Sequence, residues 1–302
     1  MKRKLFIATS SFDLKNYSAR KRGFGSLKIL KNPLKRKLNY NEVVKFAKNS
    51  DYIIAGTEQY NKKNLNKLKK LKAIFRLGSG IDNINLDICK KLKVKVFKSN
   101  ITPEVAVSEL IISNIINMLR KTIDQHNNFK NNIWKKEMGF TLKDKKVGII
   151  GYGKIGKYLA KVIKGFGVDV YVNDLKKINN KNYLSLEKIF KKCDIVSLNL
   201  SLNQKSLNLI KKNKLNLLKK NSIIINYSRP EVMDYNYLFK ILKKRKILGA
   251  ILDVFPKEPY SGNFQKLDNV ILTPHIGSYA IEIRNYMERE LIDKVIKYNE
   301  KI

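Results

Sequence analysis

The sequence predicts an α/β protein built from two doubly wound parallel sheets, and three observations support this fold class. Short runs rich in β-branched residues alternate with helical stretches along almost the whole chain, a pattern typical of parallel sheets covered by helices. Ten such runs are too many for one sheet of this kind. The 302 residues are enough for two domains of ordinary size.

The expected strands are short apolar runs, at 4–8, 51–56, 72–78, 93–97, 146–151, 168–174, 194–200, 222–226, 249–254 and 269–272. The expected helices lie between them, at 42–49, 63–71, 156–165, 185–192, 234–244 and 280–298. A long helix from about Val105 to Lys121 is apolar on most sides, so we expect it to be buried near the domain boundary. We expect a second short helix, containing Trp134, before the strand at 146.

Composition limits the class of protein. Apolar residues make up 43% of the chain, enough to bury sizeable cores. No apolar run approaches the ~18 residues that cross a bilayer, and the run at 5–8 is too short for a signal peptide. Cys89 and Cys193 lack partners at metal-ligand spacing, which indicates two structural thiols in a reduced compartment. We therefore expect a cytoplasmic protein that does not enter the membrane.

The formal net charge of +38 has two interpretations. It could indicate nucleic-acid binding, but a nucleic-acid footprint is a cluster of basic residues. Here Lys, Asn and Ile are all frequent along the whole length, which is typical of a biased composition. We therefore do not expect a nucleic-acid partner, and we expect the charge to attract small anionic molecules.

The stretch VGIIGYGKIG at 147–156 predicts a dinucleotide site. Its glycines follow a strand and open a helix, which is the context that this motif requires. Gly151 permits the tight turn, Gly153 lets backbone N–H groups approach a pyrophosphate, and Gly156 lets the helix pack close to the strand. Lys154 and Ile155 complete the loop at the positive end of the helix dipole.

Asp174 ends the next strand, 18 residues beyond Gly156, where an acid can accept hydrogen bonds from the ribose hydroxyls. A carboxylate there would repel a 2′-phosphate, so we expect NAD rather than NADP. Lys176 and Lys177 follow closely and weaken this preference. The alternative, a glycine turn that binds nothing, is disfavoured by the strand, helix and acid together.

A nicotinamide site needs a group that moves a proton, and histidine is the usual choice near neutral pH. His126 lies in a polar helical stretch and is expected at the surface, whereas His275 follows a strand. Arg229 and Glu258 also each follow a strand, where doubly wound folds bind ligands. An arginine can hold a substrate carboxylate and a glutamate can stabilise an imidazolium. The set suits reduction of a 2-keto acid, while a buried structural histidine is the alternative for His275 alone.

These residues resemble the D-isomer-specific 2-hydroxyacid dehydrogenases, of which the phosphoglycerate dehydrogenases are the best-known branch. The resemblance covers nearly the whole chain, and it is carried by RLGSGIDNINLD (76–87), TPEVAVSEL (102–110), VGIIGYGKIG (147–156), VSLNLSLNQKSLNLI (196–210), INYSRPEVMDYNYL (225–238), GAILDVFPKEP (249–259) and LTPHIGS (272–278). The spacing from Arg229 to Glu258 is also characteristic of the family.

The resemblance implies a role for each of these residues. Arg229, Glu258 and His275 take the catalytic Arg, Glu and His roles. Ser79 and Gly80 match the loop whose backbone amides receive the substrate carboxylate. By the same resemblance, Asp253 lies near the nicotinamide carboxamide and Asp174 binds the ribose.

The family architecture implies that a Rossmann NAD-binding domain, residues 98–277, is inserted into a flavodoxin-like substrate-binding domain, residues 1–97 and 278–302. The resemblance also implies a homodimer built through the nucleotide domains. Phosphoglycerate is the substrate that we expect first. A reductase for another 2-keto acid, such as a sugar-acid or phosphonate reductase, is one alternative, and a dinucleotide-sensing regulatory protein is another.

The sequence departs from the family pattern at four places. Residues 199–203 read NLSLN where many relatives have His-x-Pro-x-Thr, which affects the border of the cofactor site. Pro230 replaces a usual glycine and removes one backbone donor. Pro256 replaces the second acid of the family's DVFExEP, as it also does in phosphoglycerate dehydrogenases. The run AGTEQY (55–60) lacks the phosphate-facing arginine of many phosphoglycerate dehydrogenases.

Overall fold

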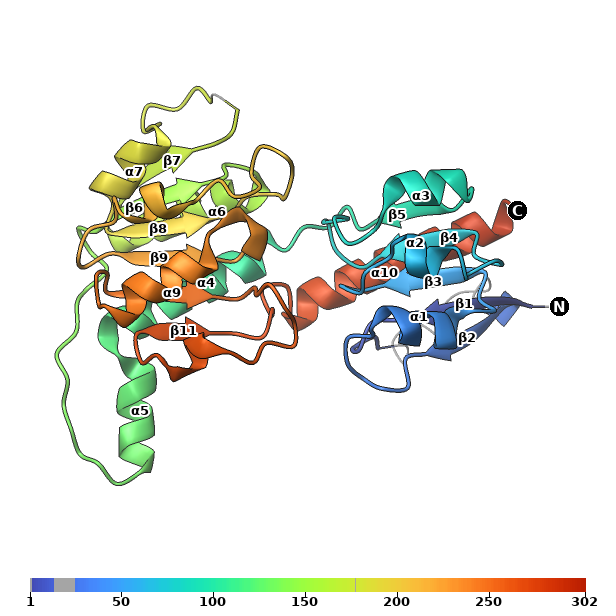
Figure 1. Cartoon of the computed structure of the whole chain (residues 1–302), viewed down its shortest axis with the longest axis horizontal. Helices are drawn as coiled ribbons and strands as arrows, with labels where there is room; N and C mark the ends of the chain where they lie inside the picture. Colours follow the sequence, from blue (N-terminus) through green and yellow to red (C-terminus); the bar gives the residue numbers. More distant parts are fainter. Residues whose placement is uncertain (1, 14–24, 177) are drawn as a thin grey trace. The chain divides into compact units, whose positions relative to one another are not determined.

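The structure is a computed structural model that describes residues 2–13, 25–176 and 178–302 (Figure 1). The chain divides into two compact units, of which unit 1 comprises Met1–Thr102 and Ala280–Ile302 and unit 2 comprises Pro103–Tyr279. The sequence predicts boundaries after residues 97 and 277, and the structure places them after Thr102 and Tyr279.

Unit 1 contains a five-stranded parallel sheet in the order β2-β1-β3-β4-β5. Its strands are β1 (Arg3–Ile7), β2 (Leu27–Lys31), β3 (Tyr52–Ala55), β4 (Ala73–Arg76) and β5 (Lys95–Lys98). Its helices are α1 (Tyr40–Ala47), α2 (Lys62–Leu65), α3 (Leu86–Lys91) and α10 (Ile281–Glu300). One face of the sheet packs on α1, α2 and α3, and the other packs on α10.

The face toward α10 shows why the C-terminal segment joins unit 1. Tyr52 of β3 and Phe75 of β4 are fully buried and pack with Met287, Leu291 and Val295 of that helix. Burying side chains of this size contributes about 1.5–3 kcal/mol each. The apolar spacing along α10 therefore fixes the last 20 or so residues against the first sheet.

Unit 2 contains a six-stranded parallel sheet in the order β11-β10-β9-β8-β6-β7. Its strands are β6 (Lys146–Ile150), β7 (Asp169–Asn173), β8 (Ile195–Leu198), β9 (Ile223–Asn226), β10 (Gly249–Leu252) and β11 (Val270–Leu272). Its α-helices are α4 (Glu104–Arg120), α5 (Thr122–Lys130), α6 (Lys154–Ile163), α7 (Leu186–Lys192), α8 (Lys212–Leu215) and α9 (Tyr235–Lys243). Short 3₁₀ turns complete it: η2 (Lys164–Phe166), η3 (Pro230–Val232) and η4 (Asn263–Lys266).

Both faces of the second sheet are buried, as a parallel sheet requires. Successive residues of β9 point to opposite sides, so that Ile224 packs with Leu238 of α9 in one core. Ile223 and Ile225 pack with Ile111 of α4 in the other core. The expected burial of the long apolar helix is explained by this second core.

The structure confirms the α/β class with two parallel sheets, and each of the ten expected strands is present. It adds β2, which reads LKILK and, among the described strands, pairs only with β1 at the edge of the sheet. The expected helix at 63–71 is shorter, since α2 ends at Leu65. The expected helix around Trp134 is wrong: α5 ends at Lys130, and a turn with a positive φ at Asn132 follows it.

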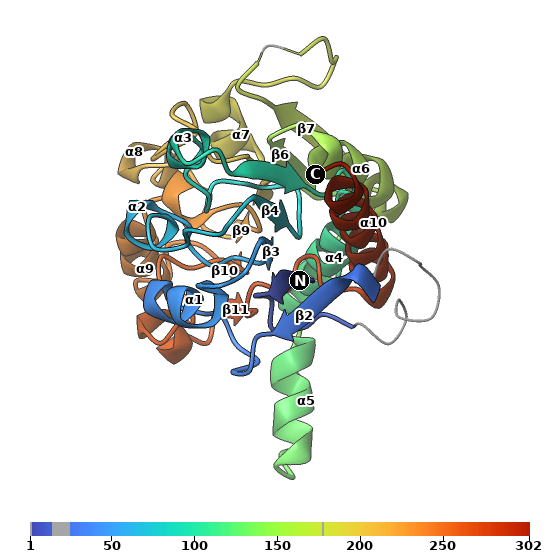
Figure 2. The ribbon, with the colours of Figure 1, turned by 90° about the vertical axis from the view of Figure 1, so that its right-hand side faces the viewer.

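The helix α5 projects from the rest of unit 2 in two perpendicular views (Figure 1, Figure 2). None of its residues is buried. Across the described residues, every helix is too short or too polar to cross a membrane.

Candidate active site

The glycine loop between β6 and α6 leaves no room for side chains at two of its three glycines. Gly151 has a φ of +95°, and a Cβ there would lie 2.5 Å from the carbonyl oxygen of Asn199. A Cβ on Gly156 would collide with the backbone of Gly151, at 3.1 Å from its carbonyl carbon and closer to its oxygen. A Cβ on Gly153, in contrast, would meet no atom of the described residues within 4 Å, so the loop is open at the helix N-terminus.

The N-terminus of α6 has amide donors available for an anion. Gly153 is the N-cap residue, and within the described chain no side chain caps the helix. The first N–H groups of a helix have no partner within the helix, so those of Lys154 and Ile155 point out of its end. Open space and free amides together fit the pyrophosphate of a dinucleotide.

The glycine loop borders a pocket of about 630 Å³, which is within the range of small-molecule sites. Asp174 lines it, and its carboxylate accepts hydrogen bonds from the backbone N–H of Tyr152 (2.6 Å) and of Lys176 (3.0 Å). Each carboxylate oxygen keeps a further acceptor position for a ribose hydroxyl. Lys176 also lines the pocket, while Lys177 lies outside the described residues.

The segment after β8, which includes the departure from the family pattern, also lines this pocket, through Asn199, Leu200, Ser201, Asn203, Gln204 and Lys205. Asn199 donates through its side-chain amide to Ser197, at 3.1 Å from the hydroxyl. Its Oδ1 is buried and has no hydrogen-bond partner in the described part of the chain. A buried acceptor without a partner is costly, so this atom indicates a donor that arrives with a ligand or water.

His275 and Glu258 form the central pair of the site. The Nδ1 atom of His275 lies 3.0 Å and 3.1 Å from the two carboxylate oxygens of Glu258. Glu258 is further oriented by the backbone N–H of Phe255, which donates to it at 3.3 Å. The His275 side chain is 31% exposed, against 18% for Glu258. With Nδ1 facing the carboxylate, Nε2 is the ring nitrogen that can exchange a proton with a substrate.

Asp253 holds the loop that carries His275. Its carboxylate accepts hydrogen bonds from the Thr273 hydroxyl (2.6 Å) and from the backbone N–H groups of Ile276 (2.8 Å) and Gly277 (2.9 Å). Burial raises the pKa of Asp253 above its ordinary value, and these donors oppose that rise. His275 itself has a φ of +56°, a strained conformation that the bonds on both sides of it maintain.

Arg229 follows β9, the neighbour of β10. Its carbonyl oxygen accepts from the Asn226 side chain at 3.0 Å, and its Nη1 donates to the carbonyl oxygen of Ser228 at 2.8 Å. Pro230 is the first residue of the 3₁₀ turn η3. A missing N–H has no cost at that position, so the departure from glycine fits the local backbone.

Two residues that the sequence analysis did not identify connect the loops after β9 and β10. Asn226 donates to the hydroxyl of Tyr235 at 3.2 Å, and this hydroxyl donates to the carbonyl oxygen of Val254 at 2.7 Å. An asparagine directly at the end of the apolar run SIIIN was the available signal.

Because β9, β10 and β11 are adjacent and parallel, Arg229, Glu258 and His275 follow the same edge of one sheet.

Ser79 and Gly80 belong to unit 1, in the loop after β4. The structure shows no acceptor among the described residues for the backbone N–H groups of 78–81.

His126 lies exposed on α5, apart from these residues, as expected. Cys89 and Cys193 are buried free thiols.

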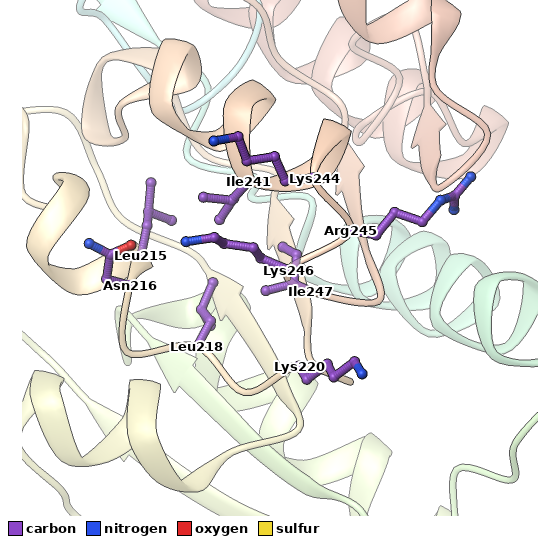
Figure 3. A pocket seen from close by; sticks show the side chains of 9 residues that line it. All are labelled: Leu215, Asn216, Leu218, Lys220, Ile241, Lys244, Arg245, Lys246 and Ile247. Atoms are coloured by element: carbon purple, nitrogen blue, oxygen red, sulfur yellow. The ribbon is translucent and has the colours of Figure 1, made fainter.

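A second pocket, of about 400 Å³, lies at the amino ends of β9 and β10, on the edge opposite to Arg229 and His275. Figure 3 shows the side chains that line it. The segments 215–220 and 241–247 line it. Lys244 and Lys246 extend over it, whereas Arg245 points away and pairs with Asp268 at 2.6 Å. It contains none of the predicted site residues.

The fold and the glycine loop define a nucleotide-binding α/β protein, and comparisons with known proteins make this more specific. The family model described as "D-isomer specific 2-hydroxyacid dehydrogenase, NAD binding domain" matches residues 112–277. The glyoxylate reductase of Thermococcus litoralis is 35% identical over 254 residues, which cover 79% of this chain and 76% of that protein. The chain therefore belongs to the D-isomer specific 2-hydroxyacid dehydrogenase family, and NAD is its cofactor.

Other relatives have different lengths and printed activities. The D-3-phosphoglycerate dehydrogenase of Haemophilus influenzae is 32% identical over 243 residues, covering 76% of this chain and 59% of that protein. This chain thus spans about three fifths of that relative. A solved structure of a putative D-isomer specific 2-hydroxyacid dehydrogenase from Polaromonas sp. JS6 66 has a TM-score of 0.88 at 22% identity, covering 100% of this chain and 98% of that chain. This last likeness confirms the fold.

Proposed function

We propose that the protein is an NAD-dependent oxidoreductase that interconverts a small D-2-hydroxy acid and its 2-keto acid. The observation that carries this proposal is the His275–Glu258 pair after β11 and β10, at 3.0 Å. It follows the carboxyl edge of the same parallel sheet as the glycine loop after β6. This is the edge at which doubly wound folds bind ligands. When bound, NADH would supply the hydride to C2 of the keto acid, and NAD+ would accept it in the reverse direction.

The roles follow from the chemistry of each group. Nε2 of His275 donates a proton to the substrate oxygen during reduction and removes it during oxidation. Glu258 orients the ring through Nδ1 and stabilises the imidazolium. Arg229 binds the substrate carboxylate with its planar fork of donors.

The cofactor contacts are proposed from the same unit. The loop of Gly151, Gly153 and Gly156, with the amides of Lys154 and Ile155, would hold the pyrophosphate. Asp174 would accept from the adenosine ribose.

We retain for Asp253 a place beside the nicotinamide carboxamide. In that position the Asp253 carboxylate would contact the carboxamide while it also accepts the three hydrogen bonds from the loop that carries His275.

For the substrate carboxylate we propose the amides of Ser79 and Gly80. Their support is that the N–H groups of 78–81 lack an acceptor in the described residues, while the loop itself is fixed at both ends. Backbone donors of this kind bind a carboxylate without adding charge.

The 3-phosphoglycerate pair remains the substrate that the sequence predicts first, but one observation favours unphosphorylated acids. The run at 55–60 provides no cation, and its Glu58 carboxylate is buried, accepting from the Gly56 N–H at 2.7 Å. A phosphate group gains nothing from this loop. Glyoxylate and hydroxypyruvate, the substrates in the printed names of two relatives, fit such a site better.

The test is the loss of NADH absorbance with purified protein and a panel of glyoxylate, hydroxypyruvate, pyruvate and phosphohydroxypyruvate, with NADPH in a parallel series. We expect turnover of at least one member and a preference for NADH. Turnover of phosphohydroxypyruvate alone would support the phosphoglycerate assignment and refute the argument from Glu58. NADH binding without turnover, together with nucleic-acid binding at physiological salt, would support the regulatory alternative.

We also propose a homodimer formed through unit 2. The projecting α5 and the segment after it expose large apolar side chains, including Phe129 (61%), Trp134 (78%) and Met138 (93%). Exposed apolar groups of this size mark interaction surfaces. Light scattering after size-exclusion chromatography should give twice the 35.1 kDa chain mass, and Trp134→Lys with Met138→Lys should give a monomer. A wild-type monomer would refute the assignment.

A further inference from the structure

Unit 1 buries an unusual polar cluster at the carboxyl ends of β3 and β4. Glu58 is 2% exposed, and Arg76 and Asn83 are each 7% exposed. Burying ionisable groups is costly unless each is bonded. The cluster joins the loop after β3 to the loop after β4, and the loop after β4 carries Ser79 and Gly80, so the role of the cluster concerns that site.

Asn83 connects the two loops through its side chain. Its amide nitrogen donates to the carbonyl oxygens of Gly56 (3.0 Å) and Glu58 (2.6 Å) in the loop after β3. Its amide oxygen accepts from Nε of Arg76, the last residue of β4, at 3.2 Å. Backbone bonds reinforce the connection, because the N–H of Tyr60 donates to the carbonyl oxygen of Asn83 at 2.8 Å.

Glu58 and Arg76 each fix a turn of the backbone. The Glu58 carboxylate accepts from the N–H of Gly56 at 2.7 Å. Nη1 of Arg76 donates to the carbonyl oxygen of Leu77, and a Cβ on Gly78 would lie 2.8 Å from the same nitrogen. Gly78 has a φ of +132°, so the chain bends closely around the guanidinium at the point where the loop begins.

The two charges also interact with each other. Burial raises the pKa of Glu58 above its ordinary value, and the positive charge of Arg76 opposes that rise. Removing one partner would leave the other charge buried and less compensated.

The segment between the two anchors carries the free amides. Leu77 is held by Arg76, Asn83 is held by the neighbouring loop, and the N–H groups of 78–81 between them have no acceptor among the described residues. Four unbonded amides in a loop with fixed ends are arranged in advance for an anion.

We propose that Glu58, Arg76 and Asn83 are positioning residues, which hold the amides of Ser79 and Gly80 in place for the substrate carboxylate. The proposal rests on the proposed function and deepens it. The network does not touch the substrate: it sets how well the loop binds the carboxylate. Its loss should therefore raise the KM for the 2-keto acid and leave NADH binding, in unit 2, unchanged.

The test compares Asn83→Ala with Asn299→Ala. Asn299 also lies in unit 1, where it accepts from Arg3 at 3.0 Å and from the Tyr52 hydroxyl at 3.0 Å, but at the amino end of the sheet. Both variants lose buried or half-buried hydrogen bonds, so both should unfold at a lower temperature. Only Asn83→Ala should raise the KM for the preferred 2-keto acid, by about tenfold or more, with the NADH Kd within about twofold of wild type.

A second variant and a second readout cover the other outcomes. If Asn83→Ala does not fold, Glu58→Gln keeps the shape and the acceptor for Gly56, and it should raise the KM by about threefold or more. Calorimetric titration of the NADH-loaded protein with oxamate measures how tightly the loop binds a carboxylate, and it does not require turnover. If wild type reduces no 2-keto acid, the proposed function fails. The positioning role would still be supported if wild type binds oxamate and Asn83→Ala binds it more weakly. An unchanged KM, an equal rise in Asn299→Ala, or no oxamate binding by wild type would overturn it.

Discussion

Substitution of the motif glycines by alanine separates packing of the fold from binding of the cofactor. At Gly156 the new methyl group would collide with the carbonyl oxygen of Gly151, and it would lie 3.2 Å from the side chain of Ile149. Backbone atoms cannot move aside as a flexible side chain can. Forcing a group into such a space costs about 1–3 kcal/mol, and we expect the upper end here.

For a unit of this size, about 3 kcal/mol lowers the unfolding midpoint by roughly 6–12 °C. At Gly153 the methyl group would meet nothing within 4 Å, and the backbone has an ordinary φ of −76°. Gly153→Ala should therefore unfold at the wild-type temperature, but its methyl group would occupy the space proposed for the pyrophosphate. We expect the NADH Kd to rise about 10- to 100-fold.

Gly165 provides the matched control, since a Cβ there also meets nothing within 4 Å and the residue lies outside the cofactor loop. Gly165→Ala should change neither property. Differential scanning fluorimetry measures the unfolding midpoint, and NADH fluorescence titration measures the Kd. Wild-type NADH affinity in Gly153→Ala would refute the placement of the pyrophosphate at this helix.

Three further predictions follow from the site and the cores. Arg229→Lys should raise the KM for the 2-keto acid and lower kcat/KM about 100-fold, because a point charge replaces a planar fork of donors. Near-normal kinetics would contradict the proposal that Arg229 binds the substrate carboxylate. Glu258→Gln should lower kcat about 10- to 100-fold in steady-state assays, because the imidazolium loses its counter-charge, and an unchanged kcat would contradict the pairing. Burial raises the pKa of Cys89 to about 11 and of Cys193 to about 12. At pH 8 about one thiol in a thousand or fewer is therefore ionised. A thiol-reactive dye should label the native protein only when the pH approaches these pKa values, or in denaturant.

The strands were predictable where apolar β-branched residues form an uninterrupted run, as in IIIN of β9. The edge strand β2 was not, because Lys28 and Lys31 interrupt its apolar residues, and among the described strands only β1 pairs with it. The expected helix at Trp134 failed for a local reason. The asparagine pair before it forms a turn with φ of +60° at Asn132, which ends α5.

The pairing of His275 with Glu258 could be anticipated, because residues after adjacent parallel strands meet at one edge of a sheet. The bonds of Asp253 could not, since two of its three donors are backbone N–H groups that leave no trace in the residue types. The same is true of Asn83, whose acceptors are two carbonyl oxygens of another loop. A hydrogen bond to the backbone depends on where the folded chain places each N–H and C=O group. Residue types alone do not reveal that placement.

The most direct test of the central claim is the turnover of the preferred 2-keto acid by His275→Ala, with the NADH Kd measured on the same preparation. Because His275 is proposed to move the proton and does not contribute to the dinucleotide loop, we expect a loss of kcat of about 100- to 10,000-fold with an NADH Kd within about twofold of wild type. Turnover close to wild type would contradict the assignment of His275 as the acid–base group. Loss of NADH binding together with turnover would show that the histidine supports the cofactor site instead.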